Sequence, residues 1–315
     1  MGIKRGIIQS RGLGDIIIAL PIARYYYEQG DEIVWPICEE FVSSVQPYVD
    51  WVEWVSIPTD PAGKFFLETP LQVFKERAVD ENQALFLYQY LNIVPELTDP
   101  EFFNILKFDQ YKYQVAAVPF VHKWKLSECI VRNAAREAAL AARLNLSERY
   151  CVAHLAGSSA RVDAALVTKF VDPAVQIINI DDYIQSGDSI FDWLGVLEGA
   201  ETVVCLDSVF ANMIDQLQLQ GPELYWIRRS SWDLTPVLGS TWTFVPTNLP
   251  IKEPQRVDPA AEAAKKRGQP ALTQPAPQAA ATPPKGSGSS GLTSHVPFET
   301  DRSKIPTSFM HALRK

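Results

Sequence analysis

Residues 3–27 read IKRGIIQSRGLGDIIIALPIARYYY, and this stretch decides the fold. Residues 3–9 are a short apolar run of the kind that a buried strand shows. A Gly-rich turn occupies residues 10–15, and apolar side chains then recur at helical spacing at Ile16, Leu20, Ala23 and Tyr27. The stretch therefore predicts a strand, a turn and an amphipathic helix, which together frame a ligand site.

The same alternation of strands and helices runs through the first 250 residues. In the first half we predict strands at 32–36, 51–57 and 113–118, helices at 39–45 and 79–91, and an irregular segment at 59–77. In the second half we predict strands at 150–155, 175–180, 202–206, 223–227 and 242–245, and helices at 189–197 and 209–217. A long Ala-rich helix at 126–144 would connect the halves. Because such alternation implies parallel sheets, the predicted fold class is α/β with two Rossmann-like domains.

The predicted domain boundaries follow from this pattern and from a change in composition. Residues 1–125 form the first domain, and residues 126–250 hold the connector helix and the second domain. From residue 253 onward the chain carries nine of its 23 prolines, so residues 251–315 are predicted to be a disordered or extended tail. Within it, residues 292–315 regain large apolar side chains, which predicts a short docking segment for a protein partner.

Charge separates the tail from the body. Residues 251–315 hold ten Lys or Arg against five Asp or Glu, a net charge of +5, so the rest of the chain carries −13 of the total of −8. An acidic body argues against nucleic acid as a partner, including an enzyme that adds sugars to nucleic-acid bases, because phosphate-backbone binding needs clustered Lys and Arg. No apolar run approaches the ~20 residues that span a bilayer, and we expect a soluble, cytoplasmic protein.

Cysteine and histidine give no sign of a metal site. Cys38, Cys129, Cys151 and Cys205 are scattered and lack the spacing of zinc ligands, so we expect four buried free thiols. The histidines at positions 122 and 154 have no partner at a diagnostic spacing, and we expect core or surface roles for both. The prediction is no metal and no tightly bound cofactor.

The turn at Gly12, Gly14 and Asp15 is the first candidate site. A dinucleotide-binding fingerprint would need a third glycine at position 17, where Ile17 stands, so a Rossmann dehydrogenase is disfavoured. The order Ser-x-Gly-x-Gly-Asp, followed by an apolar helix that contains Pro21, instead resembles the start of the lipopolysaccharide heptosyltransferase family of ADP-heptose type.

Two further segments resemble the same family. Residues 157–161 read GSSAR and follow a predicted strand, as a Gly/Ser turn does in that family. Asp207 and Ser208 begin the match to its Asp-Ser/Thr-Gly-x-x-His turn, but Val209 replaces the glycine and Asn212 replaces the histidine. The helix N-terminus and hydroxyl groups at such turns suit a phosphate.

The resemblance implies a GT-B fold and a metal-independent, inverting glycosyltransferase, with the acceptor on the N-terminal domain and a nucleotide sugar on the C-terminal domain. Asp15 would be the general base, although a carboxylate at a helix start is also a good cap. The implied substrate-binding residues are Gly12, Gly14, Ser158, Ser159, Arg161, Asp207, Ser208 and Asn212.

One alternative stays open. The chain could be a binding or structural protein that keeps the two-domain fold without turnover and is anchored in a virion or a surface complex through its tail. Val209, Asn212 and the basic tail favour this alternative, since valine cannot give a diphosphate the close backbone approach that glycine allows.

Overall fold

The computed structural model describes residues 2–89, 105–158, 160–169, 171–229, 234–247 and 249. Within these ranges the strands form two parallel sheets, as predicted, one in each half of the chain. The first sheet has the order β3-β2-β1-β4, and its strands are β1 (Lys4–Ile8), β2 (Glu32–Cys38), β3 (Val52–Ile57) and β4 (Ala84–Phe86). The second has the order β6-β5-β7-β8-β9, with β5 (Tyr150–His154), β6 (Gln176–Asn179), β7 (Thr202–Leu206), β8 (Glu223–Ile227) and β9 (Thr243–Val245).

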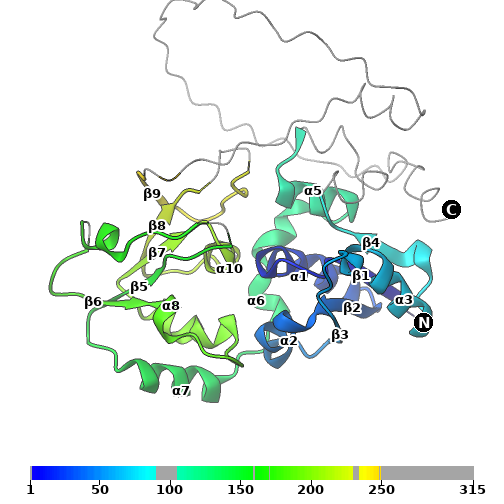
Figure 1. Cartoon of the computed structure of the whole chain (residues 1–315), viewed down its shortest axis with the longest axis horizontal. Coiled ribbons are helices and arrows are strands. Elements are labelled where there is room, and N and C mark those ends of the chain that lie inside the picture. Colours follow the sequence, from blue (N-terminus) through cyan, green and yellow to red (C-terminus); the bar gives the residue numbers. More distant parts are fainter. Residues whose placement is uncertain are drawn as a thin grey trace, which may run out of the picture.

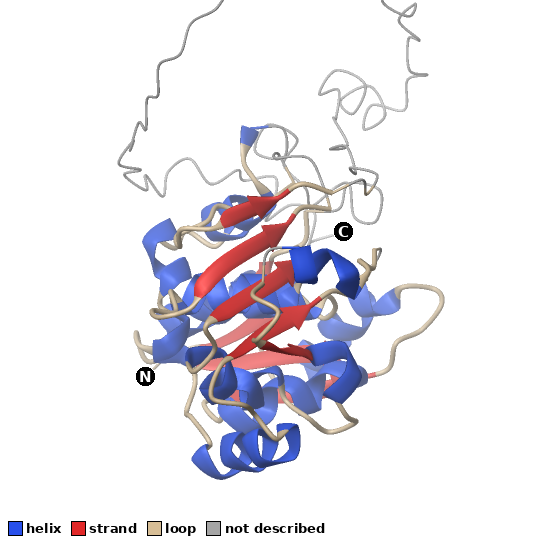
Figure 2. Ribbon diagram, turned by 90° about the vertical axis from the view of Figure 1, so that its left-hand side faces the viewer, coloured by secondary structure: helices blue, strands red, loops and turns tan. Residues whose placement is uncertain are grey.

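Helices lie on both sides of these strands (Figure 2). The first half holds α1 (Leu13–Tyr27), α2 (Glu39–Val45), α3 (Glu68–Glu76) and α5 (Phe108–Val115). The connection and the second half hold α6 (Leu126–Cys129), α7 (Ala134–Leu144), α8 (Ile180–Tyr183), α9 (Leu194–Glu198) and α10 (Val209–Leu217). Short 3-10 turns occupy Gln46–Tyr48, Lys64–Phe66, Glu81–Gln83, Phe120–Trp124, Ala164–Lys169 and Ile190–Trp193.

Several local predictions in the first half were wrong. The segment predicted as a helix at 79–91 contains β4, because pairing with β1 overrides its helical spacing. The first half of the segment predicted as a strand at 113–118 belongs to α5, whose start is fixed by the Gln110 side chain accepting the Lys107 backbone N–H at 3.1 Å. The segment predicted as irregular at 59–77 contains α3, which accommodates Pro70 in its first turn.

The predicted connector helix at 126–144 is two helices. Ile130 after α6 is extended, and the Val131 backbone N–H bonds to the carbonyl of Tyr48 at 2.7 Å instead of continuing the helix. Asn133 then caps α7 by accepting the backbone N–H of Arg136 at 3.2 Å. The break anchors the connection to the first half of the molecule. The predicted tail at 251–315, including the docking segment at 292–315, lies outside the described residues.

Helix α1 is buried on all sides, so the amphipathic stripe predicted for it was wrong. Every residue from 16 to 23 is buried, because the first sheet covers one side of α1 and the second half of the chain covers the other. Figure 1 shows α1 between its own sheet and α10, with α6 below them, and α1, α6 and α10 contact one another pairwise. A helix in this position joins the two halves.

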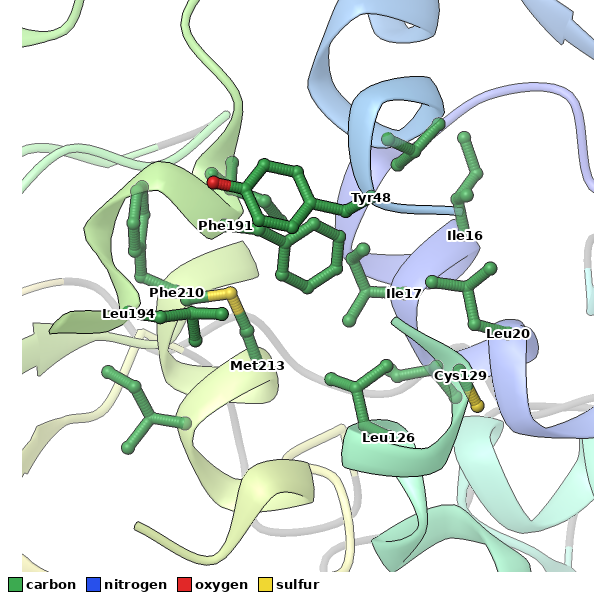
Figure 3. Packing of buried hydrophobic residues seen from close by; sticks show 14 of the residues in the cluster. Ile16, Ile17, Leu20, Tyr48, Leu126, Cys129, Phe191, Leu194, Phe210 and Met213 are labelled. Atoms are coloured by element: carbon green, nitrogen blue, oxygen red, sulfur yellow. The ribbon is translucent and has the colours of Figure 1, made fainter. Parts of the chain in front are cut away.

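One hydrophobic core therefore runs through both halves. Figure 3 shows Ile16, Ile17 and Leu20 of α1 facing Leu194, Phe210 and Met213 from the second half, with Tyr48 and Phe191 above them and Leu126 and Cys129 below. The four cysteines are buried and free, as predicted. No described helix is long and apolar enough to cross a membrane.

Two buried polar clusters also tie the halves together. In the first, Lys123 lies 2.7 Å from the Asp109 carboxylate and bonds to the carbonyl of Val237, whose own N–H donates to Asp109 at 2.9 Å. The neighbouring Asp215 accepts the Trp242 indole N–H at 3.0 Å. In the second, Asp192 accepts the Tyr48 hydroxyl at 2.9 Å and two 2.7 Å bonds from Arg136.

We predict that Lys123→Met lowers the free energy of unfolding by about 3–5 kcal/mol, because it leaves the buried Asp109 carboxylate without its cation. Urea unfolding followed by Trp fluorescence measures this loss. Since the core is continuous, the unfolding should remain a single transition for both halves.

Lys125→Met is the matched control for this substitution. Lys125 and its partner Glu128 are both exposed, so the control should change stability by less than about 1 kcal/mol. Equal effects of the two substitutions, or two separate transitions in the unmodified protein, would contradict the prediction.

Candidate functional site

The site lies at the carboxyl ends of the strands, where the strand order reverses in each sheet. In the first sheet β1 has β2 on one side and β4 on the other, and in the second β5 lies between β6 and β7. Ligands of open parallel sheets bind at such reversals, at the carboxyl ends of the strands. The three candidate turns, residues 9–15, 155–161 and 207–208, follow β1, β5 and β7 and so lie at these two positions.

Gly12 and Asp15 form the N-terminal side of the site. Gly12 has φ +83°, and a Cβ added there would lie 2.8 Å from Oδ2 of Asp15, so both the backbone and the neighbouring carboxylate require glycine. Gly12 is the N-cap of α1, which places Asp15 inside the first turn and not at the cap. The capping role considered for Asp15 is therefore not what its side chain does.

The Asp15 carboxylate is held by a buried lysine that the sequence did not indicate. Lys112 of α5 has a side chain only 2% exposed, and its ammonium lies 3.0 Å from Oδ1 of Asp15. It also donates to the Gln9 side-chain oxygen at 2.7 Å and to the carbonyl of Leu87 at 2.9 Å. One lysine thus joins the ends of β1 and β4 to α1.

This arrangement leaves the two oxygens of Asp15 in different situations. Oδ1 is paired with Lys112, whereas Oδ2 makes no hydrogen bond to any described residue, and the side chain is 24% exposed. The protein therefore presents one oriented carboxylate oxygen at the end of β1. Lys112 could not be found from the sequence, because it lies just before the segment predicted to be a strand and nothing in the spacing links it to Asp15.

The two halves meet at Gly14. A Cβ added at Gly14 would lie 3.5 Å from Nδ2 of Asn212 and 3.6 Å from Cα of Val209, so the first turns of α1 and α10 lie close together, with room for about one carbon atom between them. The predicted residues Gly14 and Asn212 are thereby brought together from opposite halves. Asp15 is next to Gly14 in the sequence, and Ser208 is next to Val209. The turn that begins α1 and the turn that begins α10 therefore lie at the same edge of the interface between the two halves.

Ser158 and Asp207 meet through an arginine. Arg229, which follows β8, donates to the Ser158 hydroxyl at 3.3 Å and lies 4.0 Å from the buried Asp207 carboxylate. Arg161 is exposed and its guanidinium makes no ion pair or hydrogen bond within the described residues. Ser159 lies outside the described residues. Sequence analysis missed Arg229, because it comes from a strand end that no motif marks.

Ser208 is paired with His154, a residue for which no partner was predicted. The Ser208 side-chain oxygen lies 2.8 Å from Nδ1 of His154, and Nε2 of His154 lies 3.6 Å from Oδ1 of Asp181. The other carboxylate oxygen, Oδ2 of Asp181, accepts the backbone N–H groups of Leu155 and Ala156 at 3.1 and 3.0 Å. These side chains come from the ends of β5, β6 and β7, and sequence spacing gives no hint of this grouping.

Burial keeps His154 neutral. Its side chain packs at a tilt against the Phe210 ring and the residue is 9% exposed, so desolvation lowers the pKa of His154 to about 4, while the Asp181 carboxylate opposes part of this shift. At neutral pH the imidazole therefore has one bare nitrogen and one N–H. No group of three metal-ligating side chains occurs among the described residues.

Comparisons with known proteins place the fold. No known protein family and no curated protein matches the chain. The solved glycosyl transferase family 9 structure from Veillonella parvula matches with a TM-score of 0.50 at 10% identity, over 85% of this chain and 90% of that one. E. coli ADP-heptose lipopolysaccharide heptosyltransferase II matches with a TM-score of 0.47 at 11% identity, over 81% and 93%. An E. coli heptosyltransferase with ADP-2-deoxy-2-fluoro heptose matches with a TM-score of 0.46 at 14% identity, over 84% and 98%.

The likeness to the family 9 structure shows that this chain shares the fold of that structure.

We predict that Lys112→Met costs about 3 kcal/mol of unfolding free energy, because the buried acceptors on Gln9 and Leu87 lose their donor. Asp15→Asn should cost about 1 kcal/mol, since Lys112 then keeps those two acceptors. Lys75→Met, at an exposed position of α3, is the control and should stay within about 0.5 kcal/mol. Chemical unfolding measures all three, and a Lys112→Met variant as stable as the control would refute the role of this lysine.

We also predict an acid-sensitive contribution from His154. Its pKa in the folded protein, about 4, lies below the 6.5 of an unfolded histidine, so its contribution is complete above pH 6.5 and is lost as the pH falls toward 4. Between pH 7 and pH 5 the unmodified protein should lose about 2 kcal/mol more than a His154→Gln variant. Unfolding curves at the two pH values give this difference, and parallel losses in both proteins would exclude it.

Proposed function

We propose that this protein transfers a glycosyl group from a nucleotide-sugar donor to a hydroxyl group of a carbohydrate acceptor. The observation that carries the proposal is the close approach of Gly14 to Val209 and Asn212, because it brings the Asp15 carboxylate near the turn that begins α10. Two turns about 190 residues apart in the sequence thus form the two sides of one site. The shared fold with a family 9 glycosyltransferase supports this reading.

In the proposed reaction, Asp15 is the general base. Oδ2 of Asp15 takes the proton of the acceptor hydroxyl while that oxygen bonds to the anomeric carbon. The bond from the anomeric carbon to the diphosphate oxygen breaks on the opposite face, so the configuration inverts and the nucleoside diphosphate leaves with the electron pair. Lys112 holds the carboxylate through Oδ1 and keeps Oδ2 oriented toward the acceptor.

The C-terminal half would hold the donor. The guanidinium of Arg161, which has no partner among the described residues, and the Ser158 hydroxyl that Arg229 positions are suited to a diphosphate. These groups would stabilise the charge that develops on the leaving diphosphate, which is the role a divalent cation has in other transferases. Asp207 lies behind them, where it keeps Arg229 in place.

A second candidate function is favoured by one observation. Val209 stands where the similar family has glycine, and it lies beside Gly14 of the other half, where a Cβ added to Gly14 would be 3.9 Å from Cβ of Val209. Together with the continuous core, this close approach suits a protein that keeps the two-domain fold for binding and has no turnover. Its protein partner would be held by residues 292–315, outside the described part of the chain.

A panel of nucleotide sugars and nucleoside diphosphates tests the proposal. At a concentration of about 100 times its Kd, a cognate donor adds about 2.7 kcal/mol of stability and raises the melting temperature by a few degrees. Arg161→Ala should remove most of this shift. Lys169→Ala, an exposed control in the same half of the chain, should retain it.

Turnover separates the two candidate functions. With a donor that binds, Asp15→Asn should lower the transfer rate by at least about 100-fold while the melting shift persists. Donor binding without any transfer or hydrolysis supports the non-catalytic candidate, and the absence of any response to the whole panel removes both nucleotide-sugar readings.

A further inference from the structure

Three neighbouring side chains, Asp181, His154 and Ser208, lead from the interior to the proposed donor site. All three side chains are largely buried, and each comes from the end of a different strand of the second sheet. Their contacts decide in which direction the Ser208 hydroxyl can form hydrogen bonds. This direction decides which ligand group Ser208 can bind, because a serine beside a diphosphate ordinarily donates its proton to a phosphate oxygen.

Asp181 fixes where the proton of His154 lies. Two backbone N–H groups hold Oδ2 of Asp181, and this anchors Oδ1 3.6 Å from Nε2 of His154. A bare Nε2 would direct its lone pair at a carboxylate oxygen, which is repulsive, whereas an Nε2–H is attracted to it. The neutral ring therefore carries its proton on Nε2 and leaves Nδ1 as an acceptor.

Ser208 then has to donate its proton to His154. Its oxygen lies 2.8 Å from Nδ1, and a bare Nδ1 at this distance requires the hydroxyl hydrogen. Ser208 is also the N-cap residue of α10, yet its side chain makes no capping hydrogen bond, so its hydroxyl is turned away from the helix. Within the described residues no N–H or O–H group donates to the Ser208 hydroxyl, and its lone pairs stay open.

A second open acceptor lies beside it. Asn212 is one helical turn along α10, and its Nδ2 donates to the carbonyl of Ser208 at 3.0 Å, which leaves Oδ1 as the remaining polar atom. That oxygen is buried, in a residue only 7% exposed, and has no hydrogen-bond partner among the described residues. The start of α10 thus holds two acceptors that receive no hydrogen bond from the described residues.

We propose that Asp181 and His154 hold the Ser208 hydroxyl as a hydrogen-bond acceptor, so that the ligand group bound there is a hydroxyl of the donor's sugar or ribose and not a phosphate oxygen. This inference rests on the proposed function and specifies it. Ser208 becomes a specificity-determining residue that reads a hydroxyl group, with Asn212 beside it, while the diphosphate is left to Ser158 and Arg161.

The same three side chains do not form an activated nucleophile. A general base works best when its pKa lies near the working pH, and burial has lowered the pKa of His154 to about 4. The imidazole is thus too weak a base to ionise Ser208, and it serves to orient the hydroxyl.

Asp181→Asn tests the inference because it reverses the donor and acceptor roles along Asp181, His154 and Ser208. The Asn oxygen can keep the N–H groups of Leu155 and Ala156, which turns its NH₂ group toward Nε2 of His154. Nε2 must then be bare, Nδ1 carries the proton, and Ser208 becomes free to donate. Asp182→Asn, at the exposed neighbouring position of α8, makes the same change in charge without this contact and is the matched control.

The first measurement needs no ligand. ¹⁵N NMR of the histidine side chains at pH 7 should show His154 protonated at Nε2 in the unmodified protein and in Asp182→Asn, and at Nδ1 in Asp181→Asn. A His154→Gln variant assigns the signal. A proton on Nδ1 in the unmodified protein, or an unchanged tautomer in Asp181→Asn, overturns the inference whatever the protein's function.

The second measurement uses the nucleotide sugar that the panel identifies. Ser208→Ala and Asp181→Asn should each weaken its binding about tenfold, the loss of one hydrogen bond, while Asp182→Asn leaves it within twofold. Binding of the corresponding nucleoside diphosphate shows which hydroxyl is bound. If both ligands lose affinity equally, the hydroxyl belongs to the ribose, and if only the nucleotide sugar loses affinity, it belongs to the transferred sugar. If a phosphate oxygen were seated on Ser208, Asp181→Asn would strengthen binding, and this result overturns the inference. If no nucleotide of the panel binds, the ligand assignment falls together with the proposed function, and the tautomer result still decides the role of Asp181.

Discussion

The burial of α1 on every side is the constraint on which the rest of the molecule depends. A helix with apolar residues all round cannot face solvent, so its second side needs a cover, which α10 and α6 provide. The two helices approach each other at Gly14, where an added Cβ would lie 3.6 Å from Cα of Val209. The shared core of the two halves follows from this packing of α1, and so does the position of the site at the edge of their interface.

A continuous core also dictates how charge is handled. Each buried ammonium group described above has carboxylate or carbonyl partners, as Lys112 and Lys123 show. The two lysines differ in how deeply their carboxylate partner is buried. Asp109 beside Lys123 is fully buried and serves only to hold the halves together, whereas Asp15 beside Lys112 keeps one oxygen at the surface. A structural ion pair and a candidate general base thus arise from the same physical requirement.

The departures from the family motif have a common physical meaning. Val209 and Asn212 both lie near Gly14 of the other half, and Asn212 donates to the carbonyl of Ser208, so both residues stand where the two halves approach each other. The second sheet places Arg161 and Ser158 after one strand end and the Ser208 hydroxyl, 2.8 Å from Nδ1 of His154, after the next. This arrangement suits a donor site and a binding site equally.

The sequence by itself determined the alternation of strands and helices, the two parallel sheets and the turns at Asp15, Ser158 and Ser208, because periodicity and Gly-rich turns are local properties. It misjudged the segments that contain β4 and α5, where pairing with β1 and burial override local propensity. Only the tertiary structure decided the partners of the site residues: Lys112, Arg229 and the pair of His154 with Asp181 come from distant segments. The ends of parallel strands gather residues that no spacing along the chain relates, which is the physical reason for this division.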